Sequence, residues 1–128
     1  MNKPAVPPAL HELERDVMEV VWERARASVR EVMDALNATG ERRRAYTTYM
    51  TIMARLARKH LLERERSGKT DYYHPVYTRE RYNDLCAQAA VESVLDEFGG
   101  VAVAHMARQM AHLDPDRRRA LEGLANED

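Results

Sequence analysis

The chain has 128 residues, 45% hydrophobic and 32% charged, with a formal net charge of −1, which suits one domain or one small domain with an appendage. The only cysteine, Cys86, can form neither an internal disulfide nor a Cys-x-x-Cys site, which favours a reducing compartment and argues against a structural zinc. No apolar run approaches the roughly 18 residues that span a bilayer, so we expect a cytoplasmic protein that is neither secreted nor inserted in a membrane.

The first part of the chain predicts two helices. Residues 1–9 are rich in proline and show no hydrophobic period, so we expect a disordered arm there. Residues 10–25 follow the 3.6-residue period of an amphipathic helix. Ser28 and Glu31 have the spacing of a capping box, which predicts the start of a second helix that ends over residues 37–40.

Residues 46–60 contain neither glycine nor proline and predict a third helix of about four turns. Its predicted inner stripe consists of Tyr49, Ile52, Met53 and Leu56. The residues that lie away from this stripe or on its border are Thr47, Thr48, Thr51 and Arg55.

Two short segments, 61–68 and 69–77, meet at turn-forming residues and predict a β-hairpin. From Thr78 onward the helical period returns and predicts a long helix that ends at Gly99, then a fifth helix, then a short last helix opened by Asp114. Three helices followed by a hairpin are typical of the winged helix-turn-helix. We therefore expect a mainly α fold with a small β-hairpin wing.

This order predicts a winged-helix DNA-binding domain over residues 10–78 and a helical dimerisation region over residues 79–128. The charge distribution bears on the first of these. Residues 42–69 carry nine basic and two acidic side chains, a net charge of +7, while the segments on either side are acidic. A basic block alone indicates either a solvated surface or a polyanion contact. Because this block covers the third helix and the hairpin, which contact DNA in winged helices, we favour DNA.

Threonines in the first turns of the third helix can bond base edges, and their methyl groups suit thymine. Thr47 or Thr48 could instead cap the helix, whereas Thr51 lies in mid-helix and has no capping role. Arg55 lies one turn after Thr51 on the same side of the helix and suits a phosphate contact. The arginines before the helix suit phosphate or a minor groove. A charged surface exposed to solvent explains such residues nearly as well. The predicted DNA-binding residues, with the hairpin tip added, are Arg43, Arg44, Tyr46, Thr47, Thr48, Thr51, Arg55 and Lys69.

The sequence offers no complete catalytic or metal motif. The segment HELER at residues 11–15 begins like a zinc-protease HExxH motif, but Arg15 stands where the second histidine is needed. His105 and His112 could share one side of a helix, yet no cysteine or carboxylate completes a ligand set. We therefore expect no metal, no cofactor and no enzymatic activity.

The chain resembles the penicillinase repressors of bacteria, the family of BlaI, MecI and CopY. LHELERDVMEVVWE and SVREVMDAL look like the first two helices of that family, and AYTTYMTIMARLARKHLLERERSGKTDYYHPVYTRE like its recognition helix and wing. VESVLDEFGGVAVAHMARQM is similar to its dimerisation region. The most specific segment is YTTxxTxxxRL, residues 46–56. The resemblance implies base contacts for Thr48 and Thr51, supporting roles for Thr47 and Arg55, and a wing contact for Lys69.

The resemblance also implies a repressor that binds a pseudo-palindromic operator as a homodimer and is relieved by proteolysis, through a membrane sensor protease or a downstream protease. Three departures qualify this expectation. His60 stands where the family usually has glycine, and the single Cys86 cannot form the cysteine-rich site of copper-responsive members. Residues 96–99 read Asp-Glu-Phe-Gly where antibiotic-responsive members are cut near an Asn-Phe bond, which leaves the inducing signal open.

The helices after Thr78 are apolar on one side but too few and short for a convincing core of their own, which independently favours burial against a second copy. We expect a fragment that ends near Thr78 to stay folded as a monomer. The alternative function is a protein-interaction module built on a winged helix that binds no DNA. The predicted dimerisation residues are Tyr82, Leu85, Val91, Val94, Leu95, Phe98, Val103, Met106 and Met110.

Overall fold

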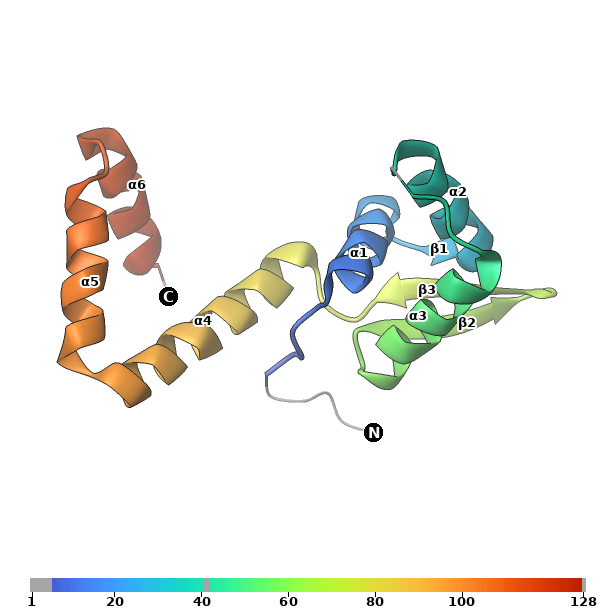
Figure 1. Cartoon of the computed structure of the whole chain (residues 1–128), viewed down its shortest axis with the longest axis horizontal. Coiled ribbons are helices and arrows are strands. Elements are labelled where there is room, and N and C mark those ends of the chain that lie inside the picture. The colour runs from blue at the N-terminus through green and yellow to red at the C-terminus, as the bar shows by residue number, and fades with distance from the viewer. Residues whose placement is uncertain (1–5, 41, 128) are drawn as a thin grey trace. The chain divides into compact units, whose positions relative to one another are not determined.

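The computed structural model describes residues 6–40 and 42–127. Figure 1 shows the elements in chain order. They are α1 (Glu12–Arg24), β1 (Ala27–Ser28), α2 (Val29–Thr39), α3 (Tyr46–Arg58), β2 (Leu62–Ser67), β3 (Thr70–Pro75), α4 (Arg79–Phe98), α5 (Gly100–Ala111) and α6 (Pro115–Ala125). This order confirms the predicted fold class, a mainly α winged helix-turn-helix followed by further helices.

The start of α2 is stabilised by the predicted capping box. The Ser28 hydroxyl accepts a hydrogen bond from the Glu31 amide at 3.1 Å, and the Glu31 carboxylate accepts one from the Ser28 amide at 2.9 Å. Two backbone N–H groups that a helix start would leave without partners are thereby satisfied. The helix-turn-helix therefore begins at the residue where the sequence predicts it.

The three strands form one antiparallel sheet in the order β1-β3-β2. The hairpin is as predicted, and its two-residue loop places Gly68 at φ 64°, a left-handed conformation that glycine adopts without strain. The sequence analysis missed β1, which pairs Ala27 with Tyr73. A strand of two residues is too short to show the alternation of apolar and polar side chains by which a strand is predicted. β1 forms because β3 supplies its hydrogen-bonding partner.

The core of the first compact unit lies among α1, α2, α3 and the sheet. On α3 it contains three members of the predicted inner stripe, Tyr49, Met53 and Leu56, while Ile52 is half-buried. The other large, fully buried apolar side chains are Val17, Met18, Val21, Val32, Leu61, Leu62 and Tyr82. Burial of one side of α3 turns its opposite side toward solvent.

The chain divides into two compact units, residues 1–87 and 88–128, so the first unit includes the beginning of α4, beyond the boundary expected after Thr78. The cause is Tyr82, which is 2% exposed and whose ring centre lies 5.5 Å from that of Trp22. Trp22 in turn donates a hydrogen bond from its indole Nε1 to the Tyr77 carbonyl at 2.9 Å. These contacts attach the first turns of α4 to α1.

Part of the segment predicted as a disordered arm has a defined place in the first unit. Pro7 is buried, and the carbonyl of Pro8 accepts a hydrogen bond from the Tyr82 hydroxyl at 2.9 Å. A proline-rich segment has no hydrophobic period, yet its free carbonyl oxygens can accept such bonds from a neighbouring helix. Residues 1–5 of the predicted arm lie outside the described residues.

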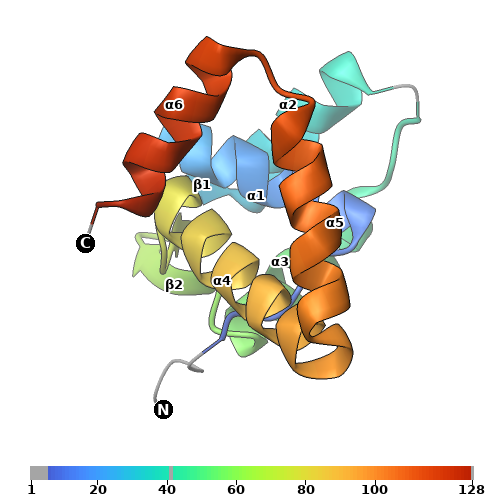
Figure 2. The same ribbon diagram turned by 90° about the vertical axis from the view of Figure 1, so that its left-hand side faces the viewer.

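In the second unit, α6 turns back from the end of α5, and the two helices diverge from that junction, as Figure 2 shows. Asp114 caps α6 by accepting a hydrogen bond from the Arg117 amide at 2.9 Å, and Pro115 is the first residue of the helix, as predicted. Arg118 donates to the carbonyls of Ala111 and Leu113 at 3.3 Å each, which ties α6 to the end of α5. No helix among the described residues is long and apolar enough to cross a membrane.

Candidate nucleic-acid interface

The outer face of α3 carries the residues that the sequence predicts to contact DNA. Thr47, Thr51 and Arg55 are exposed, and Arg58 extends the row by one turn. Thr48 is half-buried on the border of this face. Tyr46, the first residue of α3, is also exposed, so four of the five predicted α3 side chains lie on the open surface, while Thr48 stands at its edge.

The first turn of α3 has no side-chain cap. The N-cap residue is Ala45, and no side-chain hydrogen bond satisfies the helix start within the described residues. Neither Thr47 nor Thr48 caps the helix, so the capping alternative does not explain them. An uncapped helix start presents free amides and the positive end of the helix dipole, and phosphate oxygens bind well at such a position.

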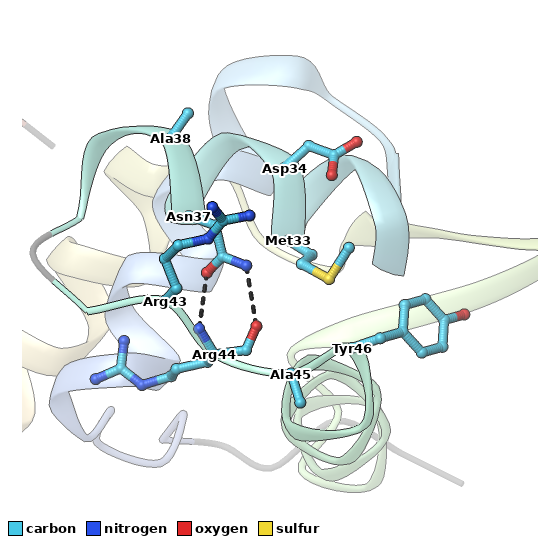
Figure 3. Close-up of a pocket in the computed structure, with 8 residues that line it drawn as sticks. All are labelled: Met33, Asp34, Asn37, Ala38, Arg43, Arg44, Ala45 and Tyr46. Carbon is cyan, nitrogen blue, oxygen red and sulfur yellow. Dashed lines mark hydrogen bonds between the residues drawn. The ribbon is translucent and has the colours of Figure 1, made fainter.

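Asn37, in the last turn of α2, holds the connection that leads into α3. Its side-chain Nδ2 donates to the Arg44 carbonyl at 2.9 Å, and its Oδ1 accepts from the Arg44 amide at 3.0 Å (Figure 3). The same Oδ1 accepts from the Tyr49 hydroxyl at 2.8 Å. The sequence analysis treated Asn37 only as a helix terminator, because nothing in the spacing reveals a partner on the next helix.

The predicted basic residues of this connection lie next to that contact. The side chains of Arg43 and Arg44 leave the chain in different directions in Figure 3. Arg43 is exposed and Arg44 is half-buried. Neither forms an ion pair with any residue that the structure describes.

The wing, residues 62–75, and the helix-turn-helix border a groove of about 940 Å³. Lys69 lies at the tip of the wing, and both it and Arg64 line the groove. Tyr46 and Met50 line the groove from α3, and the Met50 side chain is 45% exposed. The sequence analysis did not single out Met50, whose apolar character resembles that of the core residues.

The groove is lined by equal numbers of basic and acidic residues: Arg30, Arg64 and Lys69 are basic, and Glu31, Asp34 and Asp71 are acidic. Of its three acidic residues, Asp71 pairs with Arg66 at 3.5 Å, and Glu31 is engaged in the capping box of α2. Arg30 is a further basic residue of the lining and has no ion-pair partner among the described residues. The sequence analysis did not single out Arg30, because a basic residue at the start of α2 is typical of a solvent-exposed helix surface.

One positive charge of the basic block faces inward. Lys59 donates a hydrogen bond to the carboxylate of Glu14, which is 1% exposed, at 2.8 Å. Burial raises the pKa of Glu14, but the hydrogen bonds from Lys59 and from the His11 amide outweigh that effect, so the pKa lies below its ordinary value. Lys59 therefore compensates a buried carboxylate rather than the charge of a ligand.

The residues predicted for dimerisation differ in how far they are exposed. Tyr82 is buried in the first unit, and Leu85 packs against the core of that unit, so a dimer interface does not need to cover them. Leu95 and Met110 are half-buried. The remaining predicted residues are exposed, and they are Val91, Val94, Phe98, Val103 and Met106.

Comparisons with known proteins agree with this geometry. The sequence profile of the penicillinase repressor family matches residues 10–127. The transcriptional regulator BlaI of Mycobacterium tuberculosis is 36% identical over 121 residues, which make up 90% of this chain and 84% of the relative.

Two solved structures are similar to part of this chain. The DNA-binding domain of the repressor BlaI has a TM-score of 0.52 and 26% identity, covering 59% of this chain and 90% of that one. The monomeric form of BlaI from Bacillus licheniformis in complex with the blaP half-operator has a TM-score of 0.50 and 26% identity, with the same coverage.

Proposed function

The chain belongs to the penicillinase repressor family, and on that basis we propose that it is a transcriptional repressor that binds a pseudo-palindromic operator as a homodimer. The observation that carries the proposal is the open face of α3, with exposed Thr47, Thr51 and Arg55 beside a wing whose tip is Lys69. This is the pairing of recognition helix and wing that winged-helix proteins use on DNA. The function requires no catalytic residue.

In the proposed complex, α3 lies in the major groove. Thr47 and Thr51 reach base edges with their hydroxyl and methyl groups, while Thr48 acts from the border of the face. Arg55 and Lys69 bind phosphates on the two sides of the recognition helix. The solved complex of the Bacillus licheniformis BlaI monomer with a half-operator supports this use of the fold.

The proposed dimer forms through the helices of residues 88–128. Ala102 is the buried hydrophobic residue among the described part of this unit, whereas large apolar side chains there are exposed. Exposure of such an apolar surface to water is energetically unfavourable. A second copy of the same chain can bury this surface in a symmetric dimer. The exposed apolar residues include Val101, Leu121 and Leu124 besides those predicted from the sequence.

Proteolysis within the C-terminal helices would then relieve repression. Each half-site contact is weak alone, and dimerisation makes the second contact intramolecular. A membrane sensor protease or a downstream protease that separates the two units would remove this advantage and leave the DNA-reading surface intact.

Binding of the full-length protein to genomic fragments at several salt concentrations tests the proposed function. We expect one set of fragments to be retained with an affinity that falls steeply as salt rises, because every neutralised phosphate releases counterions. No retained fragment, or an affinity that does not respond to salt, would reject DNA binding. That outcome would favour the alternative, a protein-interaction module built on the same winged helix.

A further inference from the structure

We propose that Asn37 is a positioning residue for operator recognition, which sets the placement of α3 by joining the Arg44 peptide to Tyr49. The inference rests on the proposed function, because it concerns how the recognition helix is held and not whether the protein binds DNA. Figure 3 shows Asn37 facing the connection that leads into α3.

The contact joins three segments at one side chain. Asn37 lies near the end of α2, Arg44 lies two residues before α3, and Tyr49 lies in the second turn of α3. The Oδ1 atom of Asn37 accepts one hydrogen bond from the Arg44 amide at 3.0 Å and another from the Tyr49 hydroxyl at 2.8 Å. Its Nδ2 atom donates to the Arg44 carbonyl at 2.9 Å.

An amide side chain is needed for this arrangement. It must donate to a carbonyl and accept from an amide of the same residue, so it pairs with Arg44 as a neighbouring strand would. A carboxylate cannot donate, and a hydroxyl is too small to make both contacts. The ring of Tyr49 is fully buried, so its hydroxyl also needs a partner, and Asn37 supplies it.

The consequence for DNA is a matter of geometry. Base contacts require side chains to be held within about 0.5 Å of their productive positions, whereas long basic side chains can follow a phosphate. Thr47 follows Arg44 by three residues, so freedom at the Arg44 peptide displaces the first turn of α3. Loss of Asn37 should therefore reduce affinity for the operator more than affinity for unrelated DNA.

Four full-length variants test this: Asn37→Ala, Tyr49→Phe, the double variant, and Thr39→Ala as a matched control. Thr39 lies in the same turn of α2, but its hydroxyl bonds to the Ala35 carbonyl of its own helix. The operator probe is the duplex that the wild-type protein enriches from a randomised library, and the reference probe is a random duplex of equal length. Both affinities are measured at one salt concentration, well below the unfolding temperature of every variant, together with hydrogen exchange of the Arg44 amide.

We expect Asn37→Ala to weaken operator binding about tenfold and random-duplex binding less than about twofold, with faster exchange at Arg44. Tyr49→Phe should have a smaller effect in the same direction. The double variant should resemble Asn37→Ala, because the two residues act through one contact. Thr39→Ala should match the wild type in every measurement.

An unchanged ratio of operator to random affinity in Asn37→Ala would overturn the inference, even if the variant is less stable. If Asn37→Ala does not fold, the Tyr49→Phe variant tests the inference instead, because it retains the buried ring and removes only the hydroxyl that bonds to Asn37. A wild-type ratio preserved in that variant, with unchanged exchange at Arg44, would then overturn the inference. A wild-type protein that enriches no duplex would reject the proposed function itself, and the inference with it.

Discussion

Lys59, at the end of α3, donates a hydrogen bond to the buried carboxylate of Glu14, in the first turn of α1, across 2.8 Å. The two residues are 45 positions apart in the chain, and their contact ties the recognition helix to the first helix. The charge of Lys59 is therefore used inside the protein. The proposed DNA contact is left to other basic residues of the block, among them Arg43, Arg44, Arg55 and Lys69.

The first prediction concerns this ion pair. Because the pKa of Glu14 is lowered in the folded protein, ionisation of Glu14 contributes stability above its ordinary pKa of 4.5, and that contribution is lost as pH falls through the lower folded pKa. Lys59→Met leaves the carboxylate buried without its partner and should cost about 3 kcal/mol of unfolding free energy at pH 7. Near pH 4 the cost should be smaller, because Glu14 of the variant can take up a proton.

Urea unfolding of wild type and Lys59→Met at the two pH values measures this difference. An equal loss at pH 7 and pH 4 would contradict an electrostatic origin. The same variant should keep the wild-type salt dependence of operator binding, since Lys59 is not expected to contact a phosphate.

The second prediction concerns the end of α3, where His60 has φ 62°. The Leu61 amide donates to the Leu56 carbonyl at 3.0 Å and the His60 amide to the Ala57 carbonyl at 3.1 Å, the pattern of a Schellman motif. Glycine is favoured at this left-handed position, because it has no Cβ to clash with the backbone. His60→Gly should raise the unfolding free energy by about 1 kcal/mol.

Thermal unfolding of His60→Gly and of His60→Ala measures the effect. The alanine variant removes the imidazole and retains the unfavourable conformation, so it should not be stabilised. Equal stabilisation of both variants would show that the imidazole, and not the backbone, is the cause.

Much of the fold could be predicted because it depends on local patterns. The inner stripe of Tyr49, Met53 and Leu56 follows from helical periodicity, and the start of α2 follows from the spacing of Ser28 and Glu31. The left-handed conformation after α3 was not predicted, because His60 stands where the family usually has glycine, and the structure has it at His60 nonetheless.

The rest depends on contacts between residues that lie far apart in the chain, which no local pattern records. Tyr82 has the spacing of an amphipathic helix, and only the position of Trp22 shows that it belongs to the first unit. Lys59 looks like any other basic residue until Glu14 is found beside it. The role of Asn37 likewise requires knowledge of where the α3 connection passes.

The third prediction separates base contacts from phosphate contacts. Thr51 is exposed on α3 and Lys69 lies at the wing tip. Thr51→Ala should reduce discrimination between operator and random DNA by about 1 to 3 kcal/mol, whereas Lys69→Ala should weaken binding to both about equally. Titration of each variant with both duplexes gives the ratio of operator affinity to random-duplex affinity for that variant. A change in discrimination for Lys69→Ala but not for Thr51→Ala would invert the assignment.

The last prediction concerns a fragment that contains only the first unit. A fragment ending at Thr78, as the sequence favoured, would lack Tyr82, and loss of a buried aromatic side chain costs about 3 to 5 kcal/mol. A fragment of residues 1–87 retains Tyr82 with its hydrogen bond to Pro8, so it should stay folded while the shorter one unfolds more readily.

The fragment 1–87 should also be monomeric, because the exposed apolar residues of the second unit are absent from it. Without the dimer, binding of the second half-site is no longer intramolecular, and operator affinity should fall by roughly 10²- to 10⁴-fold with no change in the contacts to each half-site. Sedimentation of the fragment and the full-length chain, with operator titration of both, measures these effects. If a monomeric fragment binds the operator as tightly as the full-length chain, dimerisation contributes nothing to operator affinity. If the fragment remains dimeric, the dimer contact lies in the first unit. In either case cleavage between the units could not release the operator, so this experiment also tests the physical basis of proteolytic induction.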